Sequence, residues 1–531
     1  MTHRTQLKQT SIATSQKTYW NISEHKLIFQ TIEKKQGNFS TTGALVCHTG
    51  EHTKCSTQDT YIVKDTFTKN AIWWDGPNSP YMPEDFDNLY KEVIEFISDK
   101  EIYITDVHTS AKKEHQLTFR VVSQYPWQNL FVKNLYFTAE KEAYNHEIPD
   151  WHIFITPDFK ACPLKNKTTK ENFTIINFSA KSILIGGSSY SGEIKKAIST
   201  VISYIMILKK NVLPLRCSAN IGSKEDVALF FGASGTGKTT FTFDPTRAFI
   251  GDDLHGWDDE TLFNIESGCY SKCLNINEEK EPKVFSAIRF GSLLENASFF
   301  RDTDIIDYSN KKITENVRAC YPLHFLENSS KTLIGNMPKN IFLLTCDSFG
   351  VLPPISKLTI EQAMFYFISG YTARVREDDN NISSVPKAIF SPCFSESILP
   401  LHPIVYTELF GSKIQENNVN VWLVNTGWSG GPYGTGNRLK LSYTKAIINA
   451  AINNELEDAH YVKQPVTGLL MPLQCRGIPS HLLDPENAWN NRDYYFKTLN
   501  LVAANMIQNF CKYDSISCKR IKSGGPQVQI E

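Results

Sequence analysis

The strongest constraint on this chain is a glycine-rich loop followed by lysine and threonine. Residues 232–239 read Gly-Ala-Ser-Gly-Thr-Gly-Lys-Thr and fit the phosphate-loop pattern G-x-x-x-x-G-K-[ST] without a mismatch. The preceding residues, Asp226 to Phe231, predict a buried strand, and Thr239 onward predicts a helix. Glycines let backbone N–H groups turn toward phosphate oxygens, and a helix N-terminus adds partial positive charge. This context favours a phosphate-binding site over an ordinary strand-to-turn loop.

Two aspartates follow the loop closely. The strand pattern Phe249–Gly251 ends in Asp252 and Asp253, a position that suits Mg²⁺ held near phosphates. Lys238 is expected to reach the terminal phosphates, and the Thr239 hydroxyl is expected to hold the Mg²⁺ ion. Only 15 residues separate Lys238 from Asp253 (253 − 238). This spacing leaves too little chain for the usual crossover helix, which argues against a helicase or a small GTPase.

Short apolar strands alternate with helical segments along the rest of the chain. β-Branched and aromatic runs bounded by turn residues predict strands at residues 44–46, 61–63, 102–105, 117–122, 151–155, 182–185, 227–231, 249–251, 341–345 and 419–424. Helices are expected at residues 83–97, 193–209 and 360–368. The fold class is therefore mixed α/β. A new strand-rich region begins after the second of these helices, which predicts two domains, 1–212 and 213–531.

Composition limits the partners. The formal net charge is −1, from 55 basic and 56 acidic residues, so no positive excess points to nucleic acid or to an anionic membrane. The 12 cysteines show no paired zinc-site spacing, which favours a reduced, cytoplasmic protein. The apolar run from Ala197 to Leu208 is about a dozen residues, too short to span a bilayer, and predicts a buried helix. Small-molecule partners are expected, with neither nucleic acid nor membrane.

The segments around the phosphate loop resemble the ATP-dependent phosphoenolpyruvate carboxykinases. The resemblance begins with Gly232–Thr240, Asp244-Pro and Gly251-Asp-Asp-x-His255-Gly-Trp257. It extends, in the family's order, to Tyr190-x-Gly-Glu-x-Lys195-Lys196, Glu315-Asn-Val-Arg318, Phe349-Gly-Val-Leu-Pro-Pro354, Asn425-Thr-Gly-Trp428 and Gly434-Thr-Gly-Asn-Arg438. It can be followed from about Gly43 to Gly525, nearly the whole chain.

The resemblance implies a fold and a reaction. The fold is a two-domain phosphoenolpyruvate carboxykinase-like α/β fold, with the phosphate loop in the C-terminal domain and the active site between the domains. The reaction converts oxaloacetate and ATP to phosphoenolpyruvate, ADP and CO₂, a step of gluconeogenesis. Negative charge accumulates on enolate and phosphoryl oxygens, so ATP, Mg²⁺ and a second metal, usually Mn²⁺, are the implied cofactors.

The resemblance also implies residue roles. Lys196, as a neutral amine beside Lys195, and Asp253 match ligands of the second metal. Arg318 matches an arginine that bridges substrate and γ-phosphate, and Tyr190 a residue beside the substrate and CO₂. The implied nucleotide-binding positions are Gly232, Ser234, Gly235, Thr236, Gly237, Lys238, Thr239, Thr240, Glu281, Arg438, Leu439 and Thr444.

Several positions depart from the family's pattern. Cys55, in the segment Thr53–Val63, stands where the family has an arginine that holds the dicarboxylate with a two-donor fork. Arg216 stands where a histidine contributes a nitrogen to Mn²⁺, and arginine stays protonated and cannot ligate a metal. Leu254 replaces an acidic residue, and the segment from Ala373 to Asp379 also differs. These changes concern the substrate and the second metal, whereas the phosphate loop persists.

Three functions therefore stay open at the level of the sequence. The leading hypothesis is a carboxykinase that makes phosphoenolpyruvate. The second is a catalytically impaired pseudoenzyme that binds ATP without turnover. The third is an ATP-dependent enzyme acting on a different small acid, with Cys55 and Arg216 reshaping the pocket.

Overall fold

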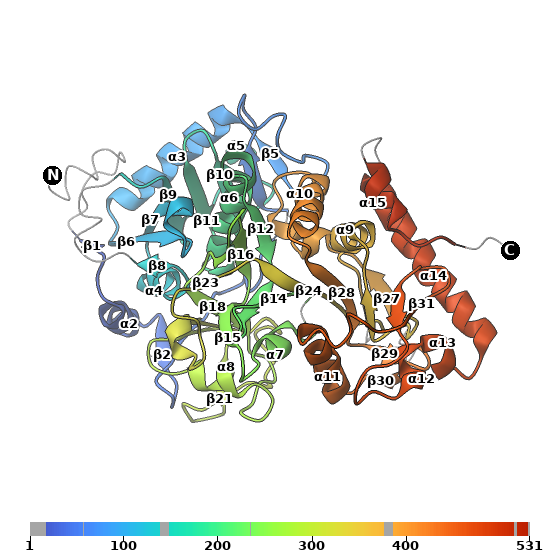
Figure 1. Cartoon of the computed structure of the whole chain (residues 1–531). Helices are drawn as coiled ribbons and strands as arrows, with labels where there is room; N and C mark the ends of the chain where they lie inside the picture. The colour runs from blue at the N-terminus through green and yellow to red at the C-terminus, as the bar shows by residue number, and fades with distance from the viewer. Residues whose placement is uncertain are drawn as a thin grey trace. The chain divides into compact units, whose positions relative to one another are not determined.

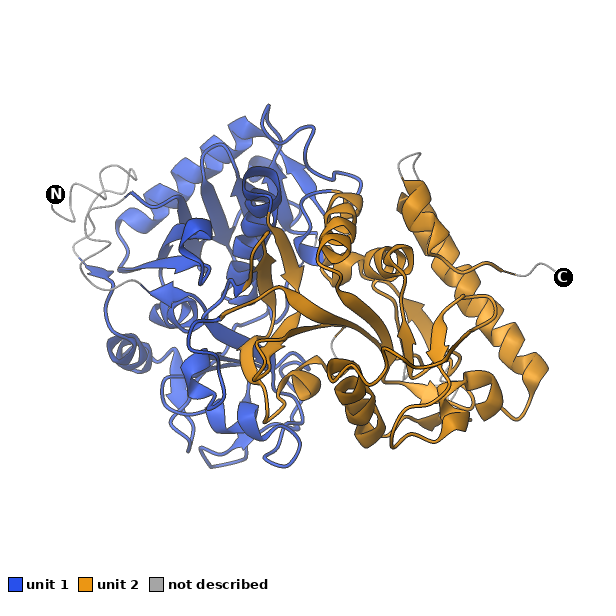
Figure 2. Cartoon of the chain, viewed as in Figure 1, with its two compact units in different colours: residues 1–211, 263–333, 397–401 blue, residues 212–262, 334–396, 402–531 orange. Residues whose placement is uncertain are grey.

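The computed structural model describes residues 17–56, 58–138, 148–233, 235–375, 386–513 and 518–528. It is a mixed α/β protein, as the sequence predicted (Figure 1). The chain divides into two compact units (Figure 2). Unit 1 comprises residues 1–211, 263–333 and 397–401, and unit 2 comprises residues 212–262, 334–396 and 402–531.

The division of the chain is discontinuous. The first change of unit falls between Asn211 and Val212, next to the boundary expected at residue 212. Residues 263–333, which the expected division assigns to the second domain, cluster with unit 1 instead. The two-domain assignment 1–212 and 213–531 stays a prediction about folding.

Unit 1 contains a nine-stranded mixed sheet. Its order is β1-β6-β7-β9-β11-β10-β4-β5, with β8 paired to β6. The strands are β1 (Thr18–Trp20), β4 (Thr60–Val63), β5 (Ser79–Tyr81), β6 (Ile102–Thr109), β7 (Leu117–Ser123), β8 (Phe137–Thr138), β9 (Trp151–Thr156), β10 (Phe173–Asn177) and β11 (Ser182–Gly186).

A second sheet of unit 1 is built from distant segments of the chain. Its order is β18-β22-β19-β3-β2. Its strands are β2 (Gly37–Phe39), β3 (Leu45–Cys47), β18 (Gly268–Lys272), β19 (Leu293–Glu295) and β22 (Arg318–Pro322), and β20 (Ser298–Phe299) pairs with β21 (Ile306–Asp307). The helices of unit 1 are α2 (Glu24–Glu33), α3 (Pro83–Ser98), α4 (Pro126–Leu135), α5 (Pro163–Asn166), α6 (Gly192–Lys210) and α8 (Pro282–Ala287), with short 3-10 turns at Lys113–His115 and Leu323–Phe325.

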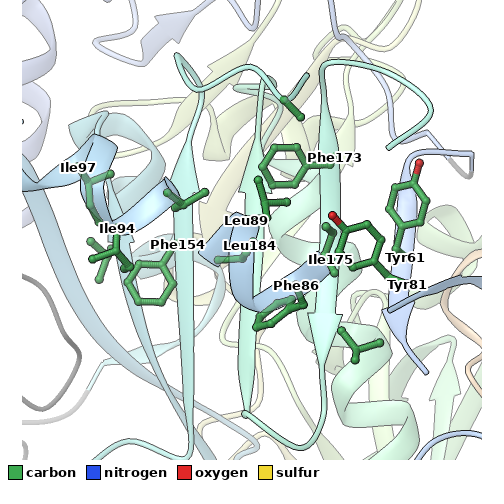
Figure 3. Close-up of a cluster of buried hydrophobic side chains, with 14 of the residues drawn as sticks. Tyr61, Tyr81, Phe86, Leu89, Ile94, Ile97, Phe154, Phe173, Ile175 and Leu184 are labelled. Carbon is green, nitrogen blue, oxygen red and sulfur yellow. The ribbon is translucent and has the colours of Figure 1, made fainter. Parts of the chain in front are cut away.

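Helix α3 shows why unit 1 has a well-packed core. It opens with Pro83 at its first turn, followed by Glu84 and Asp85, which suit a helix N-terminus. Its buried residues recur at helical spacing and form one apolar face. That face packs against the nine-stranded sheet (Figure 3), in a cluster that includes Phe86, Leu89, Ile94, Ile97, Phe154, Phe173, Ile175 and Leu184.

Unit 2 contains an eight-stranded sheet of order β15-β13-β14-β24-β28-β25-β32-β31. Its strands are β13 (Ser218–Ile221), β14 (Val227–Phe231), β15 (Ala248–Gly251), β24 (Pro338–Thr345), β25 (Ile355–Lys357), β28 (Asn420–Asn425), β31 (Tyr461–Lys463) and β32 (Leu470–Pro472). Strands β14, β24 and β28 are parallel neighbours at its centre.

Shorter strands and helices complete unit 2. The strand pairs are β12 (Leu213–Arg216) with β16 (Leu254–Trp257), β26 (Thr372–Val375) with β27 (Pro386–Ile389), and β29 (Trp428–Ser429) with β30 (Asn437–Arg438). β23 (Ile334–Gly335) is also short, and β17 (Leu262–Asn264) carries the chain into unit 1. The helices are α7 (Lys238–Thr242), α9 (Ile360–Ser369), α10 (Pro403–Glu416), α11 (Leu441–Ile452), α12 (Ser480–Leu483), α13 (Pro485–Ala488), α14 (Arg492–Phe510) and α15 (Lys519–Ser523), with 3-10 turns at Pro392–Phe394, Glu396–Ile398 and Cys511–Tyr513.

The apolar run Ala197–Leu208 lies in α6, a helix whose residues from Gly192 to Met206 are all buried. The prediction of a buried helix there is confirmed. Within the described parts of the chain, no helix combines the length and the apolar character needed to cross a lipid bilayer.

Candidate functional site

The phosphate loop lies between a buried strand and a short helix of unit 2. β14 is buried along its whole length, and α7 begins at Lys238. Gly235 and Gly237 have φ values of +88° and +96°, a left-handed conformation that side chains rarely adopt. The Thr236 hydroxyl donates to the Ala233 carbonyl at 2.8 Å and closes the loop. The glycines at these two positions therefore follow from the backbone conformation. Ser234 lies outside the described residues.

The first turn of α7 faces a carboxylate. The Thr239 hydroxyl lies 3.5 Å from Asp252 Oδ1, and the same carboxylate oxygen accepts a hydrogen bond of 2.9 Å from Ser218. Lys238 and Thr240 flank Thr239 and are half-buried. The sequence placed Asp252 with Asp253 at a position that suits Mg²⁺, although the family resemblance assigned a metal-ligand role only to Asp253. The contact of Asp252 with Thr239 makes it a candidate oxygen ligand, beside the Thr239 hydroxyl, for a divalent cation.

The altered position 216 contacts one of the expected metal ligands. Arg216 ends β12, and its Nε donates to Asp253 Oδ1 at 2.9 Å. In the antiparallel pairing of β12 with β16, Arg216 lies directly opposite Leu254. The three residues therefore form one group: Arg216 bonds Asp253 and is the cross-strand neighbour of Leu254.

Two lysines at the start of α6 have different partners, all within unit 1. Lys195 Nζ donates to the buried carboxylate of Glu266. Lys196 Nζ donates to the Ser56 carbonyl and to the Thr60 hydroxyl, both at 2.8 Å. On a helix, adjacent residues point about 100° apart, which explains why the two amines reach different partners.

Glu193 links α6 to the loop that contains Cys55. One of its carboxylate oxygens accepts from the Ser56 backbone N–H at 3.0 Å. Burial raises the pKa of Glu193, while the Lys196 charge and the bond from Ser56 oppose that rise. Ser56 is therefore held through its N–H by Glu193 and through its carbonyl by Lys196.

Asn316 joins the substrate-side residues into one network. Its amide Nδ2 donates to the Thr53 carbonyl at 2.8 Å and to the Tyr190 hydroxyl at 2.9 Å. Its Oδ1 accepts from Arg318 Nε at 2.9 Å. One amide thus fixes the Cys55 loop, Tyr190 and Arg318 together. Sequence reasoning quoted Asn316 within the motif Glu315–Arg318 but did not single it out.

Tyr190 and Arg318 also lie beside a buried acid. Tyr270 donates its hydroxyl to Glu295, which also accepts from the Ser191 N–H at 3.1 Å. Arg318 lies over the Tyr270 ring, with 5.4 Å from its guanidinium carbon to the ring centroid. Burial raises the pKa of Tyr190, Cys55 and Glu295 raise it further, and Arg318 opposes the shift. Tyr190 therefore keeps its proton at neutral pH. Tyr270 and Glu295 carry no motif, so sequence reasoning missed them.

The residues expected on the nucleotide side belong to both units. Arg438 lies on the exposed strand β30, with 5.5 Å from its guanidinium carbon to the Trp428 ring centroid. The Leu439 N–H donates to the Gly427 carbonyl at 2.8 Å, and Thr444 is buried in α11. These three residues belong to unit 2, whereas Glu281, which precedes α8, belongs to unit 1. Their nucleotide roles stay predictions.

Comparison with known proteins assigns the chain to a family. A sequence model described as phosphoenolpyruvate carboxykinase matches residues 16–481. The chain belongs to the ATP-dependent phosphoenolpyruvate carboxykinase family. It is 44% identical to the phosphoenolpyruvate carboxykinase (ATP) of Amoebophilus asiaticus over 512 residues, 96% of this chain and 98% of the relative. It is 44% identical to the protein of that name from Flavobacterium johnsoniae, over 96% of this chain and 95% of the relative. It is 42% identical to the phosphoenolpyruvate carboxykinase (ATP) of Caldanaerobacter subterraneus, over 98% of this chain and 99% of the relative.

Against the carboxykinase pattern, the side chains fit one divalent cation and do not fit a second. Thr239 and Asp252 present a hydroxyl and a carboxylate oxygen close together, the oxygen ligands that Mg²⁺ prefers. At the position of the second metal, the Asp253 carboxylate is bonded to the guanidinium of Arg216. Among the described residues, no group of three or more His, Cys, Asp or Glu side chains is arranged to hold a metal ion.

Proposed function

We propose that this chain is an ATP-dependent phosphoenolpyruvate carboxykinase that converts oxaloacetate and ATP to phosphoenolpyruvate, ADP and CO₂. The observation that carries the proposal is the phosphate loop, with Lys238 and Thr239 opening α7 beside Asp252, in a chain that the family matches over residues 16–481. The reaction breaks the C–C bond to the departing carboxylate, and the bonding electrons form an enolate. The enolate oxygen then bonds to the γ-phosphorus as the bond to ADP breaks.

In this proposal, residues of unit 2 bind the phosphates of ATP. The left-handed glycines Gly235 and Gly237 allow the loop backbone to wrap phosphate oxygens, and Lys238 adds a positive charge. Mg²⁺ would be held by Thr239 and Asp252, where it neutralises charge on the phosphates. Arg216, fixed by Asp253, adds a further cation in the same unit.

In this proposal, residues of unit 1 bind the acid substrate and stabilise the negative charge of the enolate. Asn316 orients Arg318, whose remaining N–H groups can donate to developing negative charge. Tyr190 is positioned by the hydrogen bond from Asn316, and burial keeps its hydroxyl protonated, so it offers a neutral polar group beside the substrate. A preorganised donor set of this kind needs no rearrangement when charge develops, which is why it lowers the barrier. We include a cytoplasmic location in the proposal, because the twelve dispersed cysteines suit a reducing compartment.

The first test is phosphoenolpyruvate formation from oxaloacetate and ATP with Mg²⁺ and Mn²⁺ present. Non-enzymatic decarboxylation to pyruvate is subtracted with a sample that lacks protein. We expect clear formation, and its loss in Lys238→Ala, because the alanine removes the charge that holds the phosphates. Formation that persists unchanged in Lys238→Ala would contradict the site.

Cys55 and the Arg216–Asp253 pair favour two alternatives, which the same system separates. If the chain is an ATP-binding pseudoenzyme, wild type makes no phosphoenolpyruvate while ATP binding persists. In that case the double reversion Cys55→Arg with Arg216→His also stays inactive. If the substrate is a different small acid, other 2-oxo acids stimulate ATP turnover more than oxaloacetate does.

A further inference from the structure

Two of the altered positions are neighbours in unit 2. Arg216 and Leu254 lie opposite each other in the β12–β16 pairing, and directly opposed side chains in an antiparallel pair are close. Asp253 connects the two positions: it directly precedes Leu254, and its carboxylate accepts a hydrogen bond of 2.9 Å from Arg216 Nε. The changes at residues 216 and 254 therefore concern one small volume around the Asp253 carboxylate.

The formal charges at these positions balance. Replacing a neutral histidine by Arg216 adds one positive charge, and replacing an acidic residue by Leu254 removes one negative charge. Together the two changes equal the charge of one divalent cation. A site with Arg216 and Leu254 and no second cation therefore has the same net charge as a site with the histidine, the acidic residue and a bound second cation.

We propose that this chain binds a single divalent cation with ATP, at Thr239 and Asp252, and that the Arg216 guanidinium on Asp253 takes the place of the second cation. The inference deepens the proposed function and rests on it for the role of the site in phosphoryl transfer. Its claim about metal stoichiometry concerns side chains of unit 2 and does not depend on turnover.

The chemistry of the pair explains why a second cation is excluded. The guanidinium stays protonated at all relevant pH values, so Arg216 cannot become a ligand. A cation at Asp253 would compete with the Nε–H···O bond for the carboxylate and would lie next to a fixed positive charge. Leu254 is buried and apolar, so it offers no oxygen in compensation. The Thr239–Asp252 pair has no such obstacle, because Ser218 contacts Asp252 only through a neutral hydroxyl.

The test is a Mn²⁺ titration followed by electron paramagnetic resonance, with a non-hydrolysable ATP analogue in excess over protein and no oxaloacetate. Free Mn²⁺ is counted against a sample that contains the analogue alone. We expect wild type to bind one Mn²⁺ ion per chain and the double variant Arg216→His with Leu254→Asp to bind two. Wild type that binds two ions with similar affinity overturns the proposal. A double variant that still binds one ion overturns the role given to Arg216 and Leu254.

Asp253→Asn is the matched control. In wild type it removes the partner of Arg216 but no metal ligand, so the single Mn²⁺ ion should remain with its affinity changed by less than roughly tenfold. In the double variant the same change should return the count from two to one. Loss of the wild-type Mn²⁺ ion in Asp253→Asn overturns the proposal. Calorimetric binding of the analogue verifies that each variant is folded. A chain that makes no phosphoenolpyruvate still gives a definite stoichiometry, so failure of the proposed function is distinguished from failure of this inference.

Discussion

At the scale of single residues, Cys55 is the substitution with the clearest consequence for substrate binding. The backbone on both sides of it is fixed, because Asn316 bonds the Thr53 carbonyl and Glu193 bonds the Ser56 N–H. An arginine introduced at position 55 would extend from a held loop. We expect Cys55→Arg to raise kcat/KM for oxaloacetate by roughly ten- to a hundredfold, the usual worth of a charged hydrogen bond. Steady-state kinetics with saturating ATP measure this.

Cys55→Lys is the control for charge without fork geometry. Lysine offers a point charge in place of two parallel donors, so it should recover less than arginine does. The KM for ATP should stay the same in both variants, because position 55 corresponds to the residue that holds the dicarboxylate and ATP is expected at the phosphate loop. Equal gains from Lys and Arg would show that charge alone limits the reaction. No gain from either variant would show that position 55 does not limit the reaction with oxaloacetate.

Local sequence predicted individual residues only where a motif carried them. The phosphate loop and α7 appear where the pattern placed them. The Arg216–Asp253 bond was not predicted, because the two residues are far apart in sequence and only the β12–β16 pairing brings them together. Asn316 lay inside a recognised motif, but its three hydrogen bonds join loops that no local pattern connects.

At the scale of elements, the phosphate loop depends on the conformation of Gly237. Its φ of +96° is left-handed, and a Cβ there would lie 2.6 Å from the Phe241 ring in α7. We expect Gly237→Ala to weaken ATP binding by at least roughly tenfold, because left-handed strain and the clash both displace the loop. Isothermal titration calorimetry with Mg²⁺–ATP measures the change.

Gly434→Ala is a matched control for the conformational part of that effect. Gly434 has a φ of +86°, but its Cβ would meet nothing within 4 Å. It lies outside the phosphate loop, so the substitution should cost some stability and leave the phosphate contacts intact. An ATP affinity that falls equally in both variants would contradict a specific role for Gly237.

The nine-stranded sheet of unit 1 contains a row of three ionisable residues. Asp106, Arg120 and His152 are paired in register across β6, β7 and β9, and Arg120 Nε bonds Asp106 at 2.7 Å with both side chains almost fully buried. Burial lowers the pKa of His152 to about 4, the Arg120 charge adds to that shift, and Asp106 opposes it. The histidine is therefore neutral in the folded unit at pH 7.

This row predicts an acid sensitivity. The unfolded chain has the ordinary histidine pKa of about 6.5, so it takes up a proton before the folded unit does as the pH falls. The contribution of neutral His152 to the free energy of unfolding is fully present above a pH of about 6.5 and is lost as the pH falls toward 4. Between pH 7 and pH 5 we expect wild type to lose about 2 kcal/mol more unfolding free energy than His152→Gln, measured by urea titration. The exposed His25, changed to Gln, is the control and should behave as wild type. Identical pH profiles for wild type and His152→Gln would contradict the prediction.

Most elements could be predicted because their signals are local. Every strand and helix expected from the sequence is present, with ends shifted by a few residues at most, except that β6 and β24 extend further than the apolar runs that predicted them. β6 continues through Asp106 and His108, polar residues whose place in a strand is decided by pairing with β7. Short strands such as β2, β19 and β22 gave no usable local pattern, because their partners lie far away in the sequence.

At the scale of the whole molecule, the discontinuous course of the chain limits what sequence can reveal. A strand-rich region begins near residue 212, where the first change of unit occurs. Nothing local marks residues 263–333 as returning to unit 1, because that assignment follows from pairing. β19 is the parallel neighbour of β3, and Glu266 bonds Lys195 on α6.

This discontinuity predicts how fragments of the chain fold. A fragment of residues 1–211 would lack β18, β19 and β22, so β3 would keep only β2 as a partner. Its other edge, buried in the whole chain, would be left exposed. Helix α4, which packs against those strands through residues such as Phe131, would expose its apolar surface. Lys195 would lose the carboxylate of Glu266, and a buried charge left without its partner typically costs about 3–5 kcal/mol. We expect the fragment to bind a hydrophobic dye and to show no cooperative urea transition.

The matched fragment joins residues 1–211 to residues 263–333 through a flexible Gly/Ser linker in place of residues 212–262. It restores the five-stranded sheet and the Lys195–Glu266 pair, so it should unfold cooperatively and resist proteolysis. Circular dichroism during urea titration, with limited trypsin digestion, compares the two fragments directly. Cooperative unfolding of residues 1–211 alone would favour a folding domain that ends at residue 212, and the return of 263–333 to unit 1 would then be a packing contact added to an already stable domain. Cooperativity only in the joined fragment would mean that pairing between β3 and β19 completes the fold of unit 1.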